Sequence, residues 1–209
     1  NQPDRHPGGL PRRGRRAAPL PPEEQAFFLG LRFSNFQVRK ISWGSDSFIM
    51  MSTESDKKRH RDALKNTAGT WGKVHENPSE VKAYLHTPTF DFLLQDEQNR
   101  ISLARKALDS NNLFAPFILG LLLGKLSEKE NRISFGNIDV LRKMNKRFEE
   151  VFEFSMGRVG ERPMGNKTSR FIVLQHPDMV ISALIQTRSV QRLSFFRNLF
   201  EATPKRLLL

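Results

Sequence analysis

The segment that most constrains the fold is LFAPFILGLLLGKL, residues 113–126, where apolar side chains fill nearly every position. A helix that is apolar on all sides must be covered by neighbouring elements on all sides. The apolar run Leu113–Leu123 is broken by Pro116 and Gly120. It also falls well short of the ~20 residues that a helix needs to cross a bilayer. We therefore predict a buried central helix, no transmembrane helix and no integral membrane association.

Other segments show the three- and four-residue spacing of amphipathic helices. The clearest is Asn137–Phe154, with apolar residues from Val140 to Phe152 on one face. Thr89–Leu108 has a similar stripe, and Asn77-Pro78 offers a helix start before SEVKAYLH. Further helices are expected from Ser52 or Thr53 to about Lys65, after Pro177 and after Ser189.

One segment alternates as a strand does. In Asn35–Trp43, apolar residues recur at every second position with a one-residue slip, and Gly44 begins a turn before the apolar run Phe48–Met51. This pattern predicts a β-hairpin. No internal repeat is evident.

The expected fold class is mainly α, a helical core with a small β-hairpin near the N-terminus and an extended basic N-terminal arm. Residues 1–30 would form the flexible arm, because they are rich in Pro, Gly and Arg. Residues 31–76 would hold the hairpin and a basic helix. Residues 77–209 would form the helical core, with a basic glycine-rich loop at 157–170 and an apolar C-terminal tail.

The charge of the chain is strongly positive and unevenly distributed. The formal net charge is +12 and the pI is near 10.5. Acidic and basic residues balance within 77–156, so the excess lies in the flanks. Such a surplus favours an anionic partner, most often nucleic acid and next an anionic membrane surface. There is no cysteine, which excludes disulfides and thiolate chemistry and fits an intracellular setting (cytoplasm or nucleus) or a virion interior.

The stretch GRVGERPMGNKTSR, residues 157–170, superficially resembles a phosphate-binding loop. Such a loop needs lysine directly after its last glycine, but Asn166 separates Gly165 from Lys167. No hydrophobic strand precedes the stretch either. We therefore interpret it as a basic loop in which small residues let the backbone approach a polyanion. The alternative is an ordinary solvated loop.

Two further basic clusters are candidates for phosphate contacts. One lies in the arm, where the alternative is a disordered tail, and the other lies in the expected basic helix, where the alternative is a solvated face. A nuclear-import signal is a further alternative for both clusters. With the loop and two residues of the hairpin, the candidate nucleic-acid-binding residues are Arg12, Arg13, Arg15, Arg16, Arg39, Lys40, Lys57, Lys58, Arg59, Arg61, Arg158, Arg162, Lys167 and Arg170.

Catalytic and metal sites do not emerge from the sequence. The five histidines are scattered, without the spacing of zinc ligands. Asp91, Asp96 and Glu97 fit a solvated helix face better than a paired-carboxylate site. Aromatic residues near basic ones, such as Phe36 and Trp43, could stack on bases, but core packing is the more frequent role. We predict no enzyme activity, no cofactor and no metal.

These features favour a structural RNA-binding protein of the nucleocapsid or coat type, which packages the polymer through non-specific phosphate contacts. RNA is favoured over DNA as the partner. The arm and the tail at 203–209 would dock on neighbouring copies and form a homo-oligomer. The alternatives are an RNA-binding subunit of a large ribonucleoprotein, such as an organellar ribosome, a nuclear chromatin or transcription scaffold, and an enzyme with an unrecognised helical active site.

Overall fold

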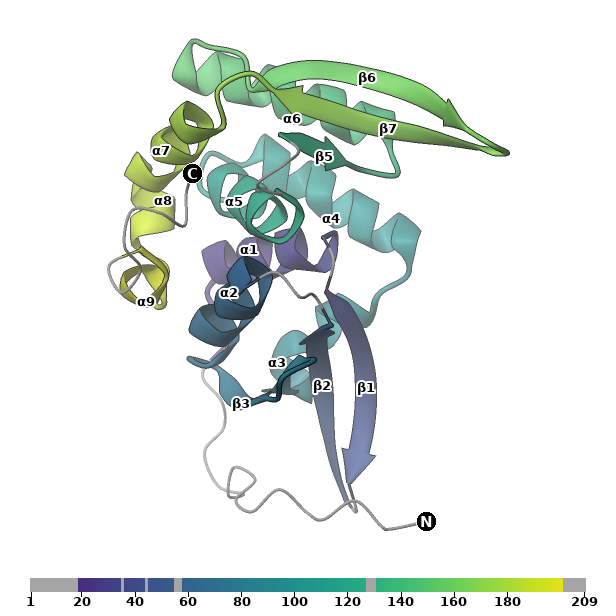
Figure 1. The fold of residues 1–209 in the computed structure, drawn as a ribbon. Coiled ribbons are helices and arrows are strands. Elements are labelled where there is room, and N and C mark those ends of the chain that lie inside the picture. The colour runs from purple at the N-terminus through teal and green to yellow at the C-terminus, as the bar shows by residue number, and fades with distance from the viewer. Residues whose placement is uncertain (1–18, 35, 44, 55–57, 127–130, 201–209) are drawn as a thin grey trace.

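The computed structural model describes residues 19–34, 36–43, 45–54, 58–126 and 131–200. Its helices and strands form two successive runs, each beginning with a buried helix (Figure 1). The first run consists of α1 (Pro22–Arg32), β1 (Gln37–Trp43), β2 (Asp46–Thr53), α2 (Lys58–Ala68), β3 (Gly72–Glu76), β4 (Val81–His86), α3 (Thr87–Phe90), the 3₁₀ helix η1 (Asp91–Leu94) and α4 (Glu97–Asp109). The second run consists of α5 (Phe114–Lys125), β5 (Arg132–Ser134), α6 (Ile138–Phe152), β6 (Gly157–Met164), β7 (Lys167–Leu174), α7 (Pro177–Gln186), α8 (Arg188–Gln191) and α9 (Phe196–Phe200).

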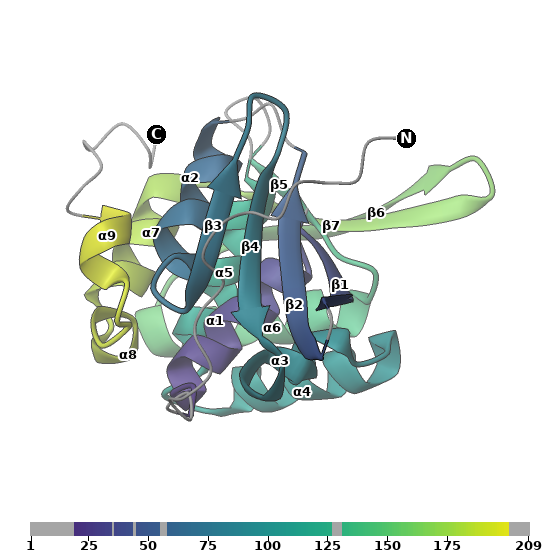
Figure 2. The same cartoon turned by 90° about the horizontal axis from the view of Figure 1, so that it is seen from below.

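The strands form two antiparallel sheets, one in each run. The first has the order β1-β2-β4-β3 and the second β5-β7-β6. Seen from below, the first sheet lies in front of α1 and α5 (Figure 2). The prediction of a mainly α fold is therefore wrong, and the protein has a mixed α/β fold. The error arose because short strands next to turns were interpreted as helices and loops.

Helices α1 and α5 pack against each other at the centre of the molecule. Their backbones meet at two glycines, and a Cβ atom on either would collide with the opposite helix. On Gly30 it would strike the carbonyl oxygen of Phe117, and on Gly120 that of Phe27. All side chains of α5 from Phe114 to Leu123 are buried. The prediction of a buried central helix over 113–126 is thus confirmed.

The two central helices also reveal an internal repeat that the sequence analysis missed. FFLGL, residues 27–31, corresponds to FILGL, residues 117–121, with four of the five residues identical. The contacts match as well, because Gly30 meets Phe117 while Gly120 meets Phe27. A reciprocal pair of contacts is the mark of a local two-fold axis.

The elements that follow each central helix repeat in the same order. In the first run α2 connects β2 to β3, and in the second run α6 connects β5 to β6. The sheet orders β2-β4-β3 and β5-β7-β6 then correspond strand by strand. Described residues 19–126 and 131–200 therefore contain two related halves that meet at α1 and α5.

Several predicted elements are confirmed. The hairpin near the N-terminus consists of β1 and β2, paired from Gln37↔Ser52 to Trp43↔Asp46. Helix α6 begins after Asn137, whose side chain accepts hydrogen bonds from two backbone N–H groups and so caps the helix. Helix α7 begins at Pro177, as expected.

Other predicted elements are wrong. SEVKAYLH contains strand β4, in which buried Val81, Ala83 and Leu85 alternate with more exposed residues, a period of two that the proline-based helix start obscured. The expected loop at 157–170 is the hairpin of β6 and β7, paired from Gly157↔Leu174 to Met164↔Lys167. Helix α1 begins at Pro22, inside the segment expected to be an arm, while residues 1–18 lie outside the described residues.

Candidate nucleic-acid interface

The second sheet separates its charges by strand alternation. Partners directly opposite each other in an antiparallel pair point to the same side of the sheet. Ile133, Ile172 and Leu174 lie on one side and are buried against the body. We call the other side the outer face of the second sheet. Its residues on the three strands are Arg132, Ser134, Arg158, Gly160, Arg162, Met164, Lys167, Ser169, Phe171 and Val173.

This outer face carries four cations and no acid. Arg158, Arg162 and Lys167 are exposed, and no ion pair joins them to any acid of the described residues. The guanidinium of Arg132 lies over the ring of Phe171, with its carbon 5.3 Å from the ring centre. The acid of this hairpin, Glu161, is on the opposite side.

Arg170 differs from the other cations of the hairpin. It pairs with Glu161 across the strands, with 2.8 Å between its Nε and the Oε1 of Glu161. It also donates to the backbone carbonyl of Gly136. Of the four cations predicted for this segment, three therefore share the outer face, and Arg170 is engaged on the other side.

The hairpin of β6 and β7 projects from the body (Figure 1). Its residues from Glu161 to Thr168 are all exposed, and Met164 next to the turn is 61% exposed. Gly165 in the turn has a positive φ of 58°, a conformation that glycine adopts without strain. A two-stranded ribbon of this kind has the width to enter the major groove of DNA.

The first sheet also has one buried side and one partly solvated side. Ile49, Met51 and Leu85 lie on the buried side. The opposite side is the outer face of the first sheet, and its residues that reach solvent are Gln37, Arg39, Ile41, Asp46, Lys73, His75, Lys82, Tyr84 and His86. Its cations are partly compensated, because Lys82 Nζ lies 2.6 Å from Glu80. Hydrogen bonding to Glu80 raises the pKa of Lys82.

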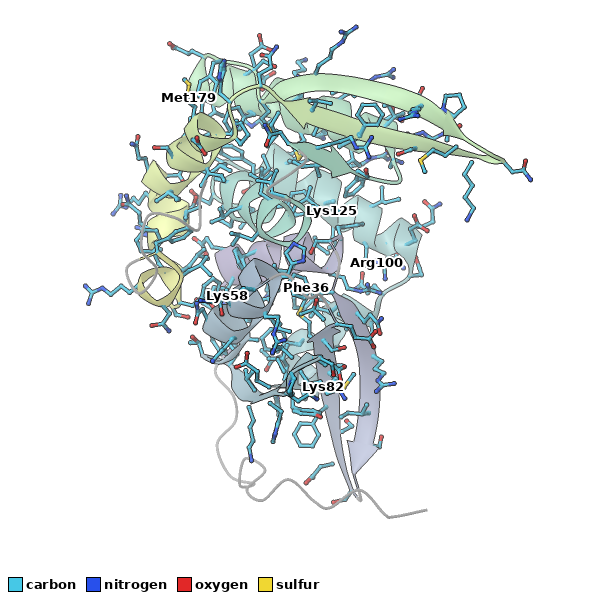
Figure 3. The ribbon with its side chains drawn as sticks, in the orientation of Figure 1. Phe36, Lys58, Lys82, Arg100, Lys125 and Met179 are labelled. Carbon is cyan, nitrogen blue, oxygen red and sulfur yellow. The ribbon has the colours of Figure 1, made fainter. Side chains whose placement is uncertain are left out.

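The remaining predicted residues are scattered. Lys40 lies opposite Ile49, so its strand position belongs to the buried side of the first sheet, although the residue is exposed at the edge strand. Arg61 donates to Glu76 and to the backbone carbonyls of Asn77 and Pro78. Lys58 is exposed at the start of α2 (Figure 3). Arg12, Arg13, Arg15, Arg16 and Lys57 lie outside the described residues, and so does the side chain of Arg59.

Arg61 belongs to a small ion-pair network that holds α2 to the β3–β4 turn. Lys65 Nζ lies 2.8 Å from Glu76, and Arg61 Nη2 lies 3.2 Å from the same carboxylate. The hydrogen bonds from Lys65 and then Arg61 lower the pKa of Glu76. This part of the predicted basic patch therefore has a structural role.

One charged residue near the centre was missed by the sequence analysis. Lys125 is the last residue of α5 and is half-buried between the half that carries β5–β7 and the half that carries β1–β4 (Figure 3). Burial lowers the pKa of its ammonium group. The available signal was a single lysine at the end of a helix in which every other residue is apolar or glycine.

The described residues contain neither a candidate metal-binding cluster nor a candidate membrane-spanning helix. Among them, no three side chains of His, Asp or Glu come together in a way that could hold a metal ion. In the same part of the chain, no helix is both long and apolar enough to span a bilayer.

The sequence matches no family model and no curated protein. The fold resembles that of a variant of the homing endonuclease I-DmoI solved with its target DNA in the presence of Mg²⁺, with a TM-score of 0.50, 10% identity and coverage of 80% of this chain and 98% of that chain. The fold also resembles that of the homing endonuclease I-WcaI bound to its DNA recognition sequence, with a TM-score of 0.48, 8% identity and coverage of 80% of this chain and 82% of that chain. For full-length DUF199/WhiA from Thermatoga maritima, the TM-score is 0.46 and the identity 16%, with coverage of 90% of this chain and 63% of that chain.

The likeness to I-DmoI corrects the functional predictions. The predictions of an RNA-packaging coat or nucleocapsid protein, of a ribonucleoprotein subunit and of a chromatin scaffold are wrong, because this fold is found in DNA-binding homing endonucleases. The prediction of no enzyme activity is also wrong, because the fold resembles that of a homing endonuclease, and homing endonucleases cleave DNA. A nucleic-acid partner agrees with the comparison, whereas a preference for RNA does not. The two-sheet architecture described above is thus the fold that this chain shares with the homing endonuclease I-DmoI.

Proposed function

We propose that this protein binds double-stranded DNA, with the outer faces of its two sheets against the duplex. The observation that carries the proposal is the charge separation on the second sheet. Strand alternation places Arg132, Arg158, Arg162 and Lys167 on one solvated side and the acid Glu161 on the other. A face with several cations and no acid attracts a polyanion and repels an acidic surface.

Duplex DNA is favoured over other polyanions for two reasons. The projecting hairpin has the dimensions of a ribbon that fits a major groove, and the internal two-fold relation matches the two-fold symmetry of a duplex. The fold likeness to I-DmoI, which was solved with its target DNA, supports the same choice. The two outer faces would make backbone contacts through their cations, and polar residues such as His75 and Tyr84 would contact base edges.

A salt titration with paired variants tests the proposal. The full chain is titrated with duplex DNA, single-stranded DNA and single-stranded RNA at several salt concentrations. Wild type should prefer the duplex, and its binding constant should fall steeply with salt. In the variant Arg158→Gln/Arg162→Gln, the slope of log K against log salt should be smaller by about 2, since each phosphate contact contributes about 0.9.

The matched control is Arg142→Gln/Lys146→Gln, which removes the same charge from the exposed side of α6 in the same half. If the control lowers the slope as much as the test variant does, binding follows net charge alone and the sheet face has no special role. A stronger affinity for single-stranded RNA than for the duplex would also contradict the proposal.

Cleavage of the duplex is a separate question that the likeness to a homing endonuclease raises. The described residues contain no carboxylate cluster to which metal-dependent cleavage can be assigned. Incubation of the same complexes with Mg²⁺ or Mn²⁺ and analysis of the strands by denaturing electrophoresis measures it directly.

A further inference from the structure

The ends of the two central helices define the middle of the molecule. Gly30 and Gly120 are counterparts in the internal repeat, and they pack against each other's helices. Ser34 and Gly124 are also counterparts, each lying four residues further along. A Cβ on Gly124 would collide with Ser34, so this second pair is in contact too. Residues that contact their own counterparts lie on or beside the local two-fold axis.

Lys125 directly follows Gly124 and therefore lies beside this axis. The contacts between counterparts also show that α1 and α5 run in parallel, so that their C-terminal ends meet on the same side. The two sheets flank this point, one in each half (Figure 3). Lys125 is the only charged residue of α5, whose other residues are buried.

Within the part of the chain that the structure describes, no acid neutralises the charge of Lys125. No hydrogen bond or ion pair joins its ammonium group to any part of residues 19–126 or 131–200 that the structure describes, and burial lowers its pKa. The partial negative charge at the C-terminus of α5 offsets the cost of burial to a limited extent. A half-buried cation without a bonded acceptor is stabilised further when an anion binds to it.

We propose that Lys125 binds a phosphate of the DNA backbone at the centre of the bound segment, where the local two-fold axis meets the duplex. This proposal rests on the proposed function. A symmetric protein places its axis on the axis of its DNA site, so a cation beside that axis reaches the phosphates between the segments that the two sheets contact. Because the side chain is half-buried, it has fewer accessible rotamers than a free surface lysine, which lowers the entropy lost on binding.

The test compares Lys125→Met, Lys125→Arg and the control Lys146→Met, whose exposed lysine lies on α6. Duplex DNA is titrated at several salt concentrations with each full-length variant. Lys125→Met should bind more weakly and show a slope of log K against log salt that is smaller by about 1, the contribution of one phosphate contact. Lys125→Arg should keep most of the slope, and Lys146→Met should leave it unchanged.

Two outcomes distinguish the two proposals. If wild type binds duplex DNA and Lys125→Met has the same slope and affinity, the phosphate contact is refuted while DNA binding stands. If wild type does not bind the duplex at any salt concentration, the proposed function fails. Thermal unfolding followed by circular dichroism tests whether each variant is folded. If Lys125→Met does not fold, Lys125→Arg reports on the same phosphate contact.

Discussion

The crossing of α1 and α5 predicts an unusual effect of replacing glycine by alanine inside a helix. Alanine normally favours a helix by about 1 kcal/mol over glycine. In Gly30→Ala, however, the new Cβ would lie 2.7 Å from the backbone nitrogen of Leu121, and ordinary contacts begin at 3.4 Å. The atoms in the way belong to the backbone, so no side chain can rotate to make room. The two helices have to separate by about 0.7 Å or more.

The cost of this separation follows from the packing that it loosens. A buried leucine makes about 40–60 contacts of about 0.1–0.2 kcal/mol each, and a gap of 0.5–1 Å forfeits a quarter to a half of each. Loosening the equivalent of one such side chain therefore costs about 1–6 kcal/mol, with a central value of about 3 kcal/mol. After subtraction of the gain in helix propensity, we expect Gly30→Ala to lower the free energy of unfolding by about 2 kcal/mol.

Urea unfolding followed by circular dichroism and by tryptophan fluorescence measures this free energy. Gly120→Ala should have a similar effect, because it is the counterpart of Gly30. The double variant should lose less than the sum of the two, since the first separation already makes room for the second methyl group. Gly136→Ala is the control, because the nearest atom to its Cβ would be 3.5 Å away. A loss below about 0.5 kcal/mol for Gly30→Ala would refute the close crossing.

Two further predictions concern buried charged groups. In Lys125→Met the cost of burying an ammonium group is removed, so the variant should be more stable than wild type at pH 7. Because the folded protein releases this proton at a lower pH than the unfolded chain, wild type should gain stability as pH rises toward 10.5, and the difference should shrink in urea unfolding at pH 9.5. Glu24 is buried in α1 and accepts hydrogen bonds from Trp71 Nε1 and from the backbone N–H of Ser194. Glu24→Gln replaces one acceptor oxygen with a donor, so it should cost about 1–3 kcal/mol and change the fluorescence of Trp71; an unchanged urea midpoint would show that the bond to Ser194 does not hold the C-terminal segment.

The sequence predicted the elements whose pattern is local. The apolar run of α5, the stripe of α6 and the hairpin of β1 and β2 all carry a clear periodicity, and the structure contains each of them. The strand β4 was missed because Asn77-Pro78 indicates a helix start, whereas the pairing of Val81–His86 with both β2 and β3 decides its conformation. Strand pairing depends on partners distant in sequence, and a single chain does not show them.

The candidate site was predicted in part. The cations at 157–170 were identified, but their interpretation as a loop concealed which of them share a side. Strand alternation separates Arg158, Arg162 and Lys167 from Arg170, and this separation requires the register of β6 and β7. Lys125 was missed because its significance depends on the contact between two helices whose close approach is visible only in three dimensions.

Both halves of this protein are encoded in one chain, and this arrangement frees each half to change alone. In a dimer of identical subunits, any substitution would appear twice and the two contact surfaces would stay identical. Here the outer face of β5–β7 carries the exposed Arg158 and Arg162, which no acid of the described residues pairs, whereas that of β1–β4 combines histidine, tyrosine and a lysine compensated by Glu80. Under the proposed function, a protein of this kind can recognise a DNA sequence whose left and right arms differ.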